Sequence, residues 1–495
     1  MRFIRFSSNF LVFAVAIVAT AQIQNPGDDD LFRELEVTEI RVTMSAADKT
    51  FLLAEENRYA EIYVPADVTF TNTELNVVEV KNVGIRLRGN TARGHDKRSY
   101  KIDFREYGGE KFKDYKKINL KPDVNDPTMA RELLSMHIYR KMGVPAARIA
   151  PAALYMNNEF MGTYLMVEQL DDEFIDKRYG HEEGFLYKCA YGATLQDNGQ
   201  VYNGDLYESE MNDELDTRAE LDLFVDKLNN TASVNFVSVI EQYFDVDMYL
   251  RQLAVEAILG HWDGYSYNKN NFYLFYNGQT NRFVFIPYDT DNTWGIDWVG
   301  QNWGTFDIEI FYHPSDPRPL TRRILEVPAY QSKYLLYVNN LLSTYFRSDY
   351  LLPLFSQLEA LFDPWVAQDT YFDNAFGFSR TFFQNNYDYS TSGHVEYGLR
   401  GFLNTRYSST DQYILSTDDA AKRLAVYPNP STAPMCTLIS SSAFSGVKVR
   451  DLSGKRVNYT LQQVAPQQWN ISLANATPGM YVIQAGEQSI KWVVR

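Results

Sequence analysis

The chain has 495 residues, which is too long for one ordinary domain and long enough to bury a large core. Aromatic residues make up 15% of it, with 35 Tyr and 31 Phe, and this composition excludes a disordered protein. The formal net charge of -16 argues against general binding to nucleic acid or to an anionic membrane surface, because both need clustered positive charge.

The N-terminus has the pattern of a secretory signal. Arg2 and Arg5 precede an apolar run at residues 10–18, and small residues follow at the place of cleavage. We therefore expect residues 1–21 to be a signal peptide and 22–34 to be a polar leader. No later run reaches the ~18 apolar residues of a membrane span, so the mature chain is expected to be exported without a transmembrane segment.

The two cysteines, Cys189 and Cys436, are too few for a disulfide framework in an exported protein. We expect two separate buried thiols rather than a bridge between them.

The first predicted elements are strands. Alternating apolar residues predict strands at 84–89 and 99–104, on either side of a basic loop bounded by glycines. In the second strand the period of two places Tyr100 and Ile102 on the apolar face and Lys101 on the other face. Lys101 therefore projects toward solvent or toward a ligand.

A helix with clear boundaries is predicted next. Asp126 is the expected N-cap, Pro127 the first helical residue and Gly143 the residue past the end. Two strands at 152–156 and 163–169 then follow, joined by a hairpin turn.

The later part of the chain is mostly helical in its periodicity. Residues 190–215 are acidic and glycine-containing and are expected to be a surface insertion. The apolar spacing predicts the helices 221–228, 248–259, 335–346, 350–362 and 397–414. The order of elements indicates an α+β body with two lobes at residues 35–415.

Beyond that body the composition changes. Residues 416–424 have the character of a linker, and residues 425–495 hold short strands separated by turns at regular spacing. We expect a separate, small all-β sandwich domain there.

The stretch from His261 to Gly295 carries the strongest chemical signal. The pattern His261-x-Asp263-x-x-x-x-Asn268 has the spacing of the protein-kinase catalytic loop, in which Asp is the base and Asn binds metal. Carboxylates and amides at strand ends are suitable ligands for Mg²⁺, which prefers oxygen. The stretch is therefore a candidate site for phosphoryl transfer.

Other residues supply what that site needs. Asp289 or Asp291, at the end of an apolar strand, can provide a further metal ligand. Lys101 on a strand, Glu132 on the following helix and Glu168 at the end of a later strand match, in order, the lysine, helix glutamate and hinge of a kinase small lobe.

Two other interpretations of the same residues remain open. The asparagines and aspartates could form turns, because both residue types are common there. Alternatively, the D-x-D-x-T pattern from Asp289 to Thr293 could belong to an aspartyl-phosphate phosphohydrolase with Asp289 as nucleophile. That chemistry usually needs strands and helices in alternation around a parallel sheet, whereas a hairpin is expected before Asp289.

Residues from about 36 to 415 resemble the spore-coat protein H (CotH) kinase family. The motifs that carry the resemblance are RLRGN at 86–90, KRSYK at 97–101, GTYLMVEQ at 162–169, the D-G-x-x-x-N pattern at 263–268, and D-x-D at 289–291 followed by WG at 294–295. Tyr288 stands where the family usually has Trp, and this change leaves both neighbouring carboxylates intact.

The resemblance implies an atypical protein-kinase-like fold that binds ATP and Mg²⁺, with Mn²⁺ as an alternative metal, and phosphorylates serines or threonines of secreted or surface proteins. Asp263 is then the catalytic aspartate. Asn268, Asp289 and Asp291 are the expected metal ligands, and the nucleotide-binding set consists of Lys101 on the phosphates, helped by Lys97 and Arg88, Glu132 paired with the lysine, and Glu168 near the adenine.

The last seventy residues resemble the C-terminal sorting domain of the type IX secretion system. The motifs are YPNP at 427–430, DLSGK at 451–455, PGMYV at 478–482 and a basic end at 491–495. The resemblance implies passage through the outer membrane by that machinery and release or tethering at the cell surface. A surface scaffold or adhesin that keeps the kinase fold without turnover is the alternative function.

Overall fold

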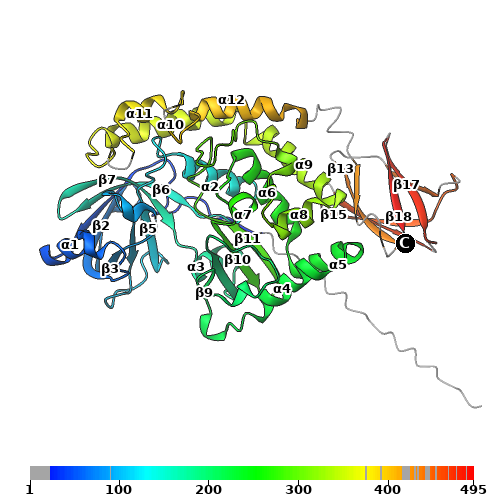
Figure 1. Ribbon diagram of the computed structural model, residues 1–495, viewed down its shortest axis with the longest axis horizontal. Coiled ribbons are helices and arrows are strands. Elements are labelled where there is room, and N and C mark those ends of the chain that lie inside the picture. Colours follow the sequence, from blue (N-terminus) through cyan, green and yellow to red (C-terminus); the bar gives the residue numbers. More distant parts are fainter. Residues whose placement is uncertain are drawn as a thin grey trace, which may run out of the picture.

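The computed structural model describes residues 23–495 except 90, 374–375, 391–392, 415–423, 428–430, 432–433, 441–445, 452–453, 466–467, 475–476, 487 and 495. The predicted signal peptide and almost all of the predicted linker lie outside these residues. Figure 1 shows a β-rich N-terminal part, a helix-rich centre and a second β-rich part that holds the C-terminus.

The N-terminal part is a closed seven-stranded barrel. Its strands, in spatial order, are β1 (Thr38–Thr43), β2 (Val64–Asn72), β3 (Asn76–Leu87), β4 (Tyr100–Asp103), β5 (Lys117–Lys121), β7 (Glu159–Glu168) and β6 (Ile149–Met156). The parallel pairing of β1 with β6 closes the barrel. Ile85, Ile102 and Leu120 fill its interior, so Arg86, Lys101 and Lys121 lie on its outer face. The helix α1 (Ala46–Leu53) follows β1.

The helix predicted to begin at Pro127 begins later, as α2 (Arg131–Lys141). Met129 has a positive φ of 58°, which an α-helix does not allow, so helical backbone cannot start before it. Asp126 still satisfies the start of the helix, because its carboxylate accepts the backbone N–H groups of Ala130 and Arg131 at 2.9 and 2.8 Å.

A second sheet lies beside the barrel and is wholly antiparallel. Its order is β11 (Arg282–Pro287), β10 (Phe272–Asn277), β8 (Gly184–Cys189) and β9 (Tyr207–Met211). Strand β9 shows that residues 190–215 are not simply a surface insertion as predicted. The sequence concealed it because only Tyr207 and Met211 are buried, with charged residues between them.

Some of the helices that follow pack against this sheet, and one of them contacts β7 of the barrel. These helices are α3 (Asp172–Tyr179), α4 (Ala219–Asn230), α5 (Ser233–Tyr243), α6 (Val246–Leu259), α7 (Tyr265–Asn268), α8 (Pro319–Leu325), α9 (Pro328–Thr344), α10 (Ser348–Val366), α11 (Arg380–Asn385) and α12 (Leu399–Thr410). The helical predictions for 221–228, 248–259, 335–346, 350–362 and 397–414 are confirmed in type, with shifted ends. In Figure 1, α10, α11 and α12 run along the top of the molecule.

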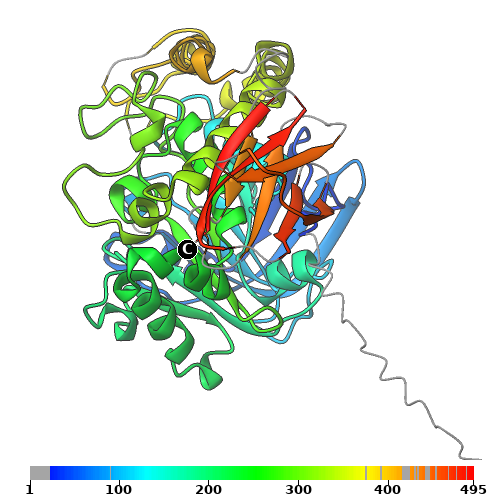
Figure 2. The same cartoon turned by 90° about the vertical axis from the view of Figure 1, so that its right-hand side faces the viewer.

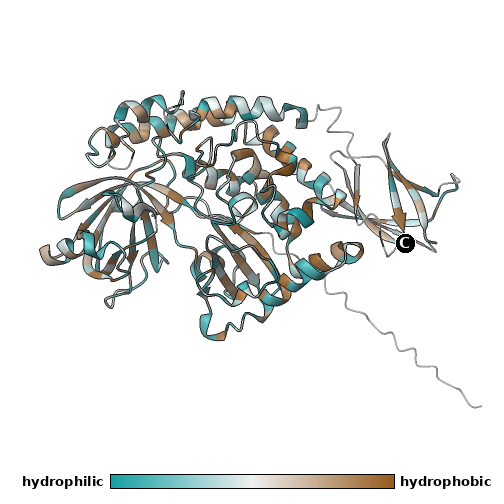
Figure 3. Cartoon of the chain, viewed as in Figure 1, coloured by the Kyte–Doolittle hydropathy of each residue, from teal (hydrophilic) through white to brown (hydrophobic). Residues whose placement is uncertain are grey.

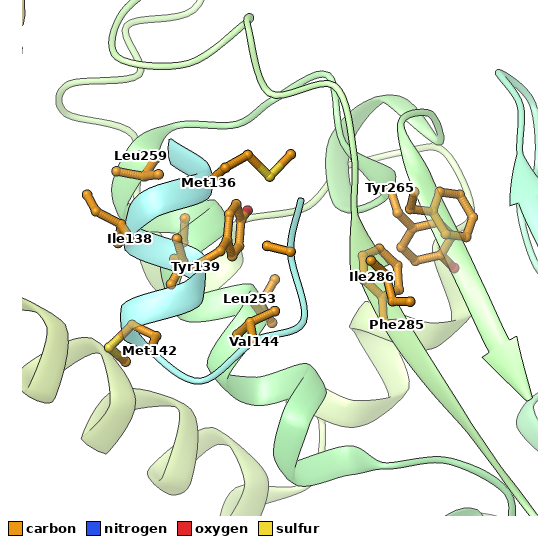
Figure 4. Packing of buried hydrophobic residues seen from close by; sticks show 14 of the residues in the cluster. Met136, Ile138, Tyr139, Met142, Val144, Leu253, Leu259, Tyr265, Phe285 and Ile286 are labelled. Carbon is orange, nitrogen blue, oxygen red and sulfur yellow. The ribbon is translucent and has the colours of Figure 1, made fainter. Parts of the chain in front are cut away.

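Helix α6 is the centre of the main core. Nearly all of its side chains are buried, and it packs against α2, α9 and β11. Figure 4 shows Tyr139 of α2 beside Leu253 and Leu259 of α6. In Figure 3 the centre of the molecule, where α6 lies, is mostly hydrophobic. Because α2 is held on α6, the start of α2 has a fixed position relative to the loop that follows α6.

The C-terminal part has two sheets around one core, in agreement with the predicted all-β region. The strands are β12 (Leu424–Tyr427), β13 (Met435–Ser440), β14 (Val447–Asp451), β15 (Tyr459–Ala465), β16 (Gln468–Leu473), β17 (Gly479–Ala485) and β18 (Gln488–Val494). Leu438 and Ile471 from one sheet and Val449 and Trp492 from the other share the core. Figure 2 views these strands from their own side of the molecule, and β12 contacts α9.

Cys189 and Cys436 are both buried and free, so the expectation of two separate thiols is confirmed. Among the described residues, no helix is long and apolar enough to cross a membrane. The chain combines α and β structure, as predicted.

Candidate functional site

Lys121, the last residue of β5, lies among three carboxylates. Its Nζ is 2.8 Å from Glu132 Oε2 and 3.4 Å from Asp291 Oδ2, and it also donates to Asp289 Oδ1. These partners come from α2 and from the segment after β11. The lysine therefore joins the barrel to the body of the molecule through charge.

The segment after β11 is held in place by hydrogen bonds to α2. Trp294 Nε1 donates to Ser135 Oγ at 3.0 Å, and Thr293 Oγ1 lies 3.0 Å from the same oxygen. Asp289 has a positive φ of 48°, which turns the chain sharply at the end of the strand. This turn brings Asp289 and Asp291 to the same lysine.

The charges of this group are strongly coupled. Burial lowers the pKa of Lys121, but its attraction to Asp289, Asp291 and Glu132 outweighs burial and holds the pKa well above its usual value. For Asp289, burial is outweighed by Lys121 and Arg88, so its pKa is lowered. Burial raises the pKa of Asp291, and the nearby Asp289 adds to that rise. The site thus holds more carboxyl groups than one lysine can keep ionised together.

Asp263 is surrounded by amide donors. Its Oδ1 accepts from Asn268 Nδ2 at 2.5 Å and from Asn270 Nδ2 at 3.3 Å, and its Oδ2 accepts from Asn271 and Asn292 Nδ2 at 3.0 Å each. Burial raises the pKa of Asp263 although these amides favour its charged form. The four amides fix the direction of the carboxylate.

The loop that carries Asp263 rests on buried groups. Trp262 Nε1 donates to the carbonyl of Ile296 at 2.8 Å, which ties the loop to the segment after β11. Gly264 allows close packing, because a Cβ there would lie 2.8 Å from Glu256 Oε1. Burial lowers the pKa of His261 to about 4 and outweighs the nearby Asp289, which raises it. His261 is therefore neutral at neutral pH.

The lysine that meets Glu132 is Lys121 and not Lys101, which the sequence had paired with it. Lys101 lies on β4, on the same outer face of the barrel, opposite Arg86 and Asn119. Burial and the neighbouring Arg88 lower the pKa of Lys101 to about 7. Within the described part of the chain, Lys101 has no ion pair within 4 Å.

Arg88 lies near the site, whereas Lys97 does not reach it. Arg88 donates to the Tyr288 hydroxyl at 2.6 Å, directly beside Asp289. Lys97 forms a buried ion pair with Asp369 at 2.6 Å, so its amine is occupied by the protein itself. The expectation that Lys97 assists on phosphates does not agree with this position.

Glu168 ends β7 and is committed to an internal network. Its carboxylate oxygens lie 2.6 Å from Arg148 Nη2 and 2.7 Å from Arg178 Nη2, and all three side chains are buried. The two arginines overcome burial and lower the pKa of Glu168. This glutamate therefore anchors the connection between the barrel and α3 rather than presenting a free carboxylate.

Sequence reasoning missed Lys121, although one signal could have found it. The strand that directly precedes α2 ends in Lys121, whereas Lys101 is one strand earlier. Adjacent elements of a chain are usually neighbours in space, so the nearer lysine was the better partner for Glu132.

The side-chain oxygen atoms at the site are of the kind that bind a hard cation. Asn292 Oδ1 and both carboxylate oxygens of Asp123 are buried and have no hydrogen-bond partner within the described ranges. Together with Asp263, Asp289 and Asp291, these are the oxygen ligands that Mg²⁺ and Mn²⁺ prefer. Of the predicted metal ligands, Asn268 contacts Asp263, whereas Asp289 and Asp291 meet at Lys121.

The sheet before Asp289 bears on the phosphohydrolase alternative. Both pairings of β10, with β11 and with β8, are antiparallel. An aspartyl nucleophile of that class is expected at the end of a parallel strand flanked by helices. The sheet therefore lacks the parallel strand on which an aspartyl-phosphate phosphohydrolase usually carries its nucleophile.

Two family models match this chain. The CotH kinase protein model matches residues 85–409, and the secretion system C-terminal sorting domain model matches residues 425–495. The first covers the barrel from the end of β3 onward and all of the candidate site residues named above. The second covers the two C-terminal sheets and indicates export to the outer surface.

Named relatives support the first match. The inner spore coat protein H of Bacillus subtilis is 27% identical over 298 residues, which are 59% of this chain and 80% of that protein. Spore coat protein homolog 1 of Rhizopus delemar is 26% identical over 340 residues, 62% of this chain and 54% of that protein. Invasin CotH7 of the same fungus is 29% identical over 184 residues, 35% of this chain and 30% of that protein. Since the family model extends over more than half of the sequence, the chain belongs to the CotH kinase protein family.

Proposed function

We propose that this protein is an exported atypical protein kinase that transfers the γ-phosphoryl group of ATP to serine or threonine of secreted or surface proteins. The observation that carries the proposal is the position of Lys121, which meets Glu132 of α2 and Asp289 and Asp291 of the segment after β11. A lysine, a helix glutamate and metal-binding aspartates in one place are the parts that phosphoryl transfer needs. The barrel and the helical body would then be the two lobes of a kinase-like fold.

Each side chain has a role in this proposal. Lys121 binds the phosphates in place of Lys101, and Glu132 holds it in position. Arg88 and Lys101 add positive charge on the same face of the barrel. Asn268, Asp289 and Asp291 hold Mg²⁺ or Mn²⁺, which would neutralise charge on the phosphates.

Asp263 orients the acceptor hydroxyl and accepts its proton. The acceptor oxygen forms a bond to the γ-phosphorus while the bond from that phosphorus to the β–γ bridging oxygen breaks, and ADP leaves. Asn268 and Asn292 keep the Asp263 carboxylate aimed through hydrogen bonds of 2.5 and 3.0 Å. Its raised pKa suits a group that must take up a proton.

The C-terminal match supports a reaction outside the cell. The sorting domain indicates passage through a secretion system, and the predicted signal peptide would direct the chain to it. The acceptor would then be a protein that is exported or displayed on the surface.

The test uses the purified chain with ATP labelled at the γ-phosphate, Mg²⁺ or Mn²⁺, and acidic acceptor proteins such as casein. We expect label on the chain itself or on an acceptor, and none with Asp263→Ala or Asp289→Ala. Asp226→Ala is the matched control, because Asp226 is half-exposed on α4 and pairs with the neighbouring surface groups Lys227 and Asn230. Equal labelling by all variants, or no labelling by any, would contradict the proposal.

A surface scaffold without turnover is the second candidate. Two observations favour it: relatives in Rhizopus delemar are named invasins, and the chain carries a sorting domain for export. In that case the ion pairs of Lys121 would serve only to stabilise the fold. The same labelling experiment separates the two functions.

A further inference from the structure

Asn119, which lies on β5 two residues before Lys121, has a buried acceptor without a partner. Its side chain is 2% exposed, and its Oδ1 has no hydrogen-bond partner among the residues that the structure describes. Buried acceptors are normally satisfied, because leaving one unpaired costs its full desolvation. The described part of the chain therefore supplies no donor to this buried oxygen.

Neighbouring hydrogen bonds fix which end of the Asn119 amide is free. The carbonyl of Leu170 can only accept, and it accepts from Gln169 Nε2 at 3.1 Å. The oxygen of Gln169 then faces Asn119 and accepts from its Nδ2 at 3.0 Å. Turning either amide over would set oxygen against oxygen or N–H against N–H. The free atom at Asn119 is therefore an acceptor and cannot become a donor.

Asn119 also lies on the same face of the barrel as Lys121, the residue assigned to the phosphates. It shares the outer face of β5 with Lys121, and the two Cα atoms are about 7 Å apart at the usual rise of a strand. Its cross-strand neighbours are Lys101 on β4 and the buried Val167 on β7. Gln169 belongs to the connection between β7 and α3. A nucleotide with phosphates at Lys121 can extend along this face toward that connection.

We propose that Asn119 Oδ1 accepts a hydrogen bond from the exocyclic amino group of the nucleobase and thereby selects adenine over a purine with oxygen at that position. This inference rests on the proposed function, because it assumes a nucleotide at Lys121. An oxo group would face the carbonyl of Asn119 and repel it, and the amide cannot turn over to compensate. The Gln169 side chain acts as the positioning residue that keeps the acceptor in place.

The first measurement is binding of three nucleotides to the full chain with Mg²⁺ by calorimetry. ATP has an amino group at C6 of the base, inosine triphosphate has oxygen there, and purine riboside triphosphate has only hydrogen. We expect ATP to bind about tenfold more tightly than either of the others, which is the value of one hydrogen bond in a buried site.

Two variants locate the cause of that preference. Asn119→Leu removes the acceptor and should bind all three nucleotides with the same affinity. Gln169→Leu frees the amide of Asn119 to turn, so inosine triphosphate should approach ATP in affinity. Asn229→Leu is the control, because Asn229 lies on α4 and donates to the backbone carbonyls of Val225 on the same helix and of Leu195. It should keep the tenfold preference.

The outcomes separate this inference from the proposed function. If the unmodified chain binds ATP and inosine triphosphate equally, or if Asn119→Leu keeps the preference for ATP, Asn119 does not select the base and the kinase proposal stands. If no nucleotide binds with Mg²⁺ or, in a repeat of the titration, with Mn²⁺, the proposed function fails and this inference fails with it.

Discussion

Lys121 Nζ lies 2.8 Å from Glu132 Oε2, across the junction between the barrel and helix α2. The same amine is 3.4 Å from Asp291 Oδ2, and the side chain of Lys121 is largely buried. One cation therefore holds together carboxylates from two separate parts of the chain. Its replacement should affect both the stability of the fold and any chemistry at the site.

Lys121→Met should lower the rate of phosphoryl transfer by about a hundredfold or more. A positive side chain placed beside the negative charge that develops in the transition state usually contributes strongly to catalysis. It should also destabilise the chain by about 3 kcal/mol, since buried carboxylates lose their counter-ion. Labelling assays and urea unfolding measure the two effects. Lys269→Met is the control, because Lys269 pairs with the half-exposed Asp316 at 3.0 Å and should cost under about 1 kcal/mol. Similar losses in both variants would argue against a special role for Lys121.

Asp263→Asn should lower kcat by about a thousandfold, as expected for removal of a group that accepts a proton. The KM for ATP should change little, because Asp263 is assigned to the acceptor hydroxyl. The size of the side chain is kept, so circular dichroism should show an unchanged fold. Steady-state kinetics with varied ATP test the prediction. A large rise in KM with kcat unchanged would instead place Asp263 at the nucleotide.

Lys101 gives a pH dependence to stability. Burial and Arg88 lower its pKa to about 7 in the folded chain, below the value of about 10.4 expected for an unfolded lysine. Between these two values the unfolded state binds more protons, so stability should rise with pH across that range. Lys101→Met removes this contribution, and Lys101→Arg keeps the charge at all these pH values.

Urea unfolding at pH 7, 8 and 9 tests whether the free energy of unfolding rises with pH. The unmodified chain should gain stability relative to Lys101→Met as the pH rises, because the buried Lys101 amine loses its proton and is no longer charged. A difference that stays constant with pH would mean that the Lys101 amine is solvated and titrates as in the unfolded chain.

How much the sequence could predict depended on the distance between partners in the chain. Asp263 and Asn268 lie on one short loop, and Asp289 and Asp291 follow the next hairpin, so their spacing alone placed them together. The exact ends of helices were harder to predict from the sequence. Asp126 was recognised as a helix cap, but the left-handed backbone at Met129 delays the helix to Arg131.

Contacts between distant strands could not be predicted in this way. The closure of the barrel depends on the parallel pairing of β1 with β6, which are separated by more than a hundred residues. Whether Lys101 or Lys121 reaches Glu132 depends on that closure and on the register of β4 and β5. The alternation of apolar residues places both lysines on the same outer face, and only the arrangement of the strands shows which one meets α2.

Glu168→Gln should destabilise the chain by about 3 kcal/mol at pH 7, because Arg148 and Arg178 would remain buried without their counter-ion. The two arginines lower the pKa of Glu168, so its contribution is complete above the ordinary pKa of a glutamate, about 4.3, and is lost as the pH falls below it. Glu208→Gln is the matched control, because Glu208 forms an exposed ion pair with Lys188 at 2.8 Å and should cost less than about 1 kcal/mol. Urea unfolding of both variants at pH 7 measures the difference. The contrary outcome is that the two variants lose equal stability while Glu168→Gln alone loses nucleotide binding. Glu168 would then act on the nucleotide, as the sequence predicted, and not on the connection between the barrel and α3.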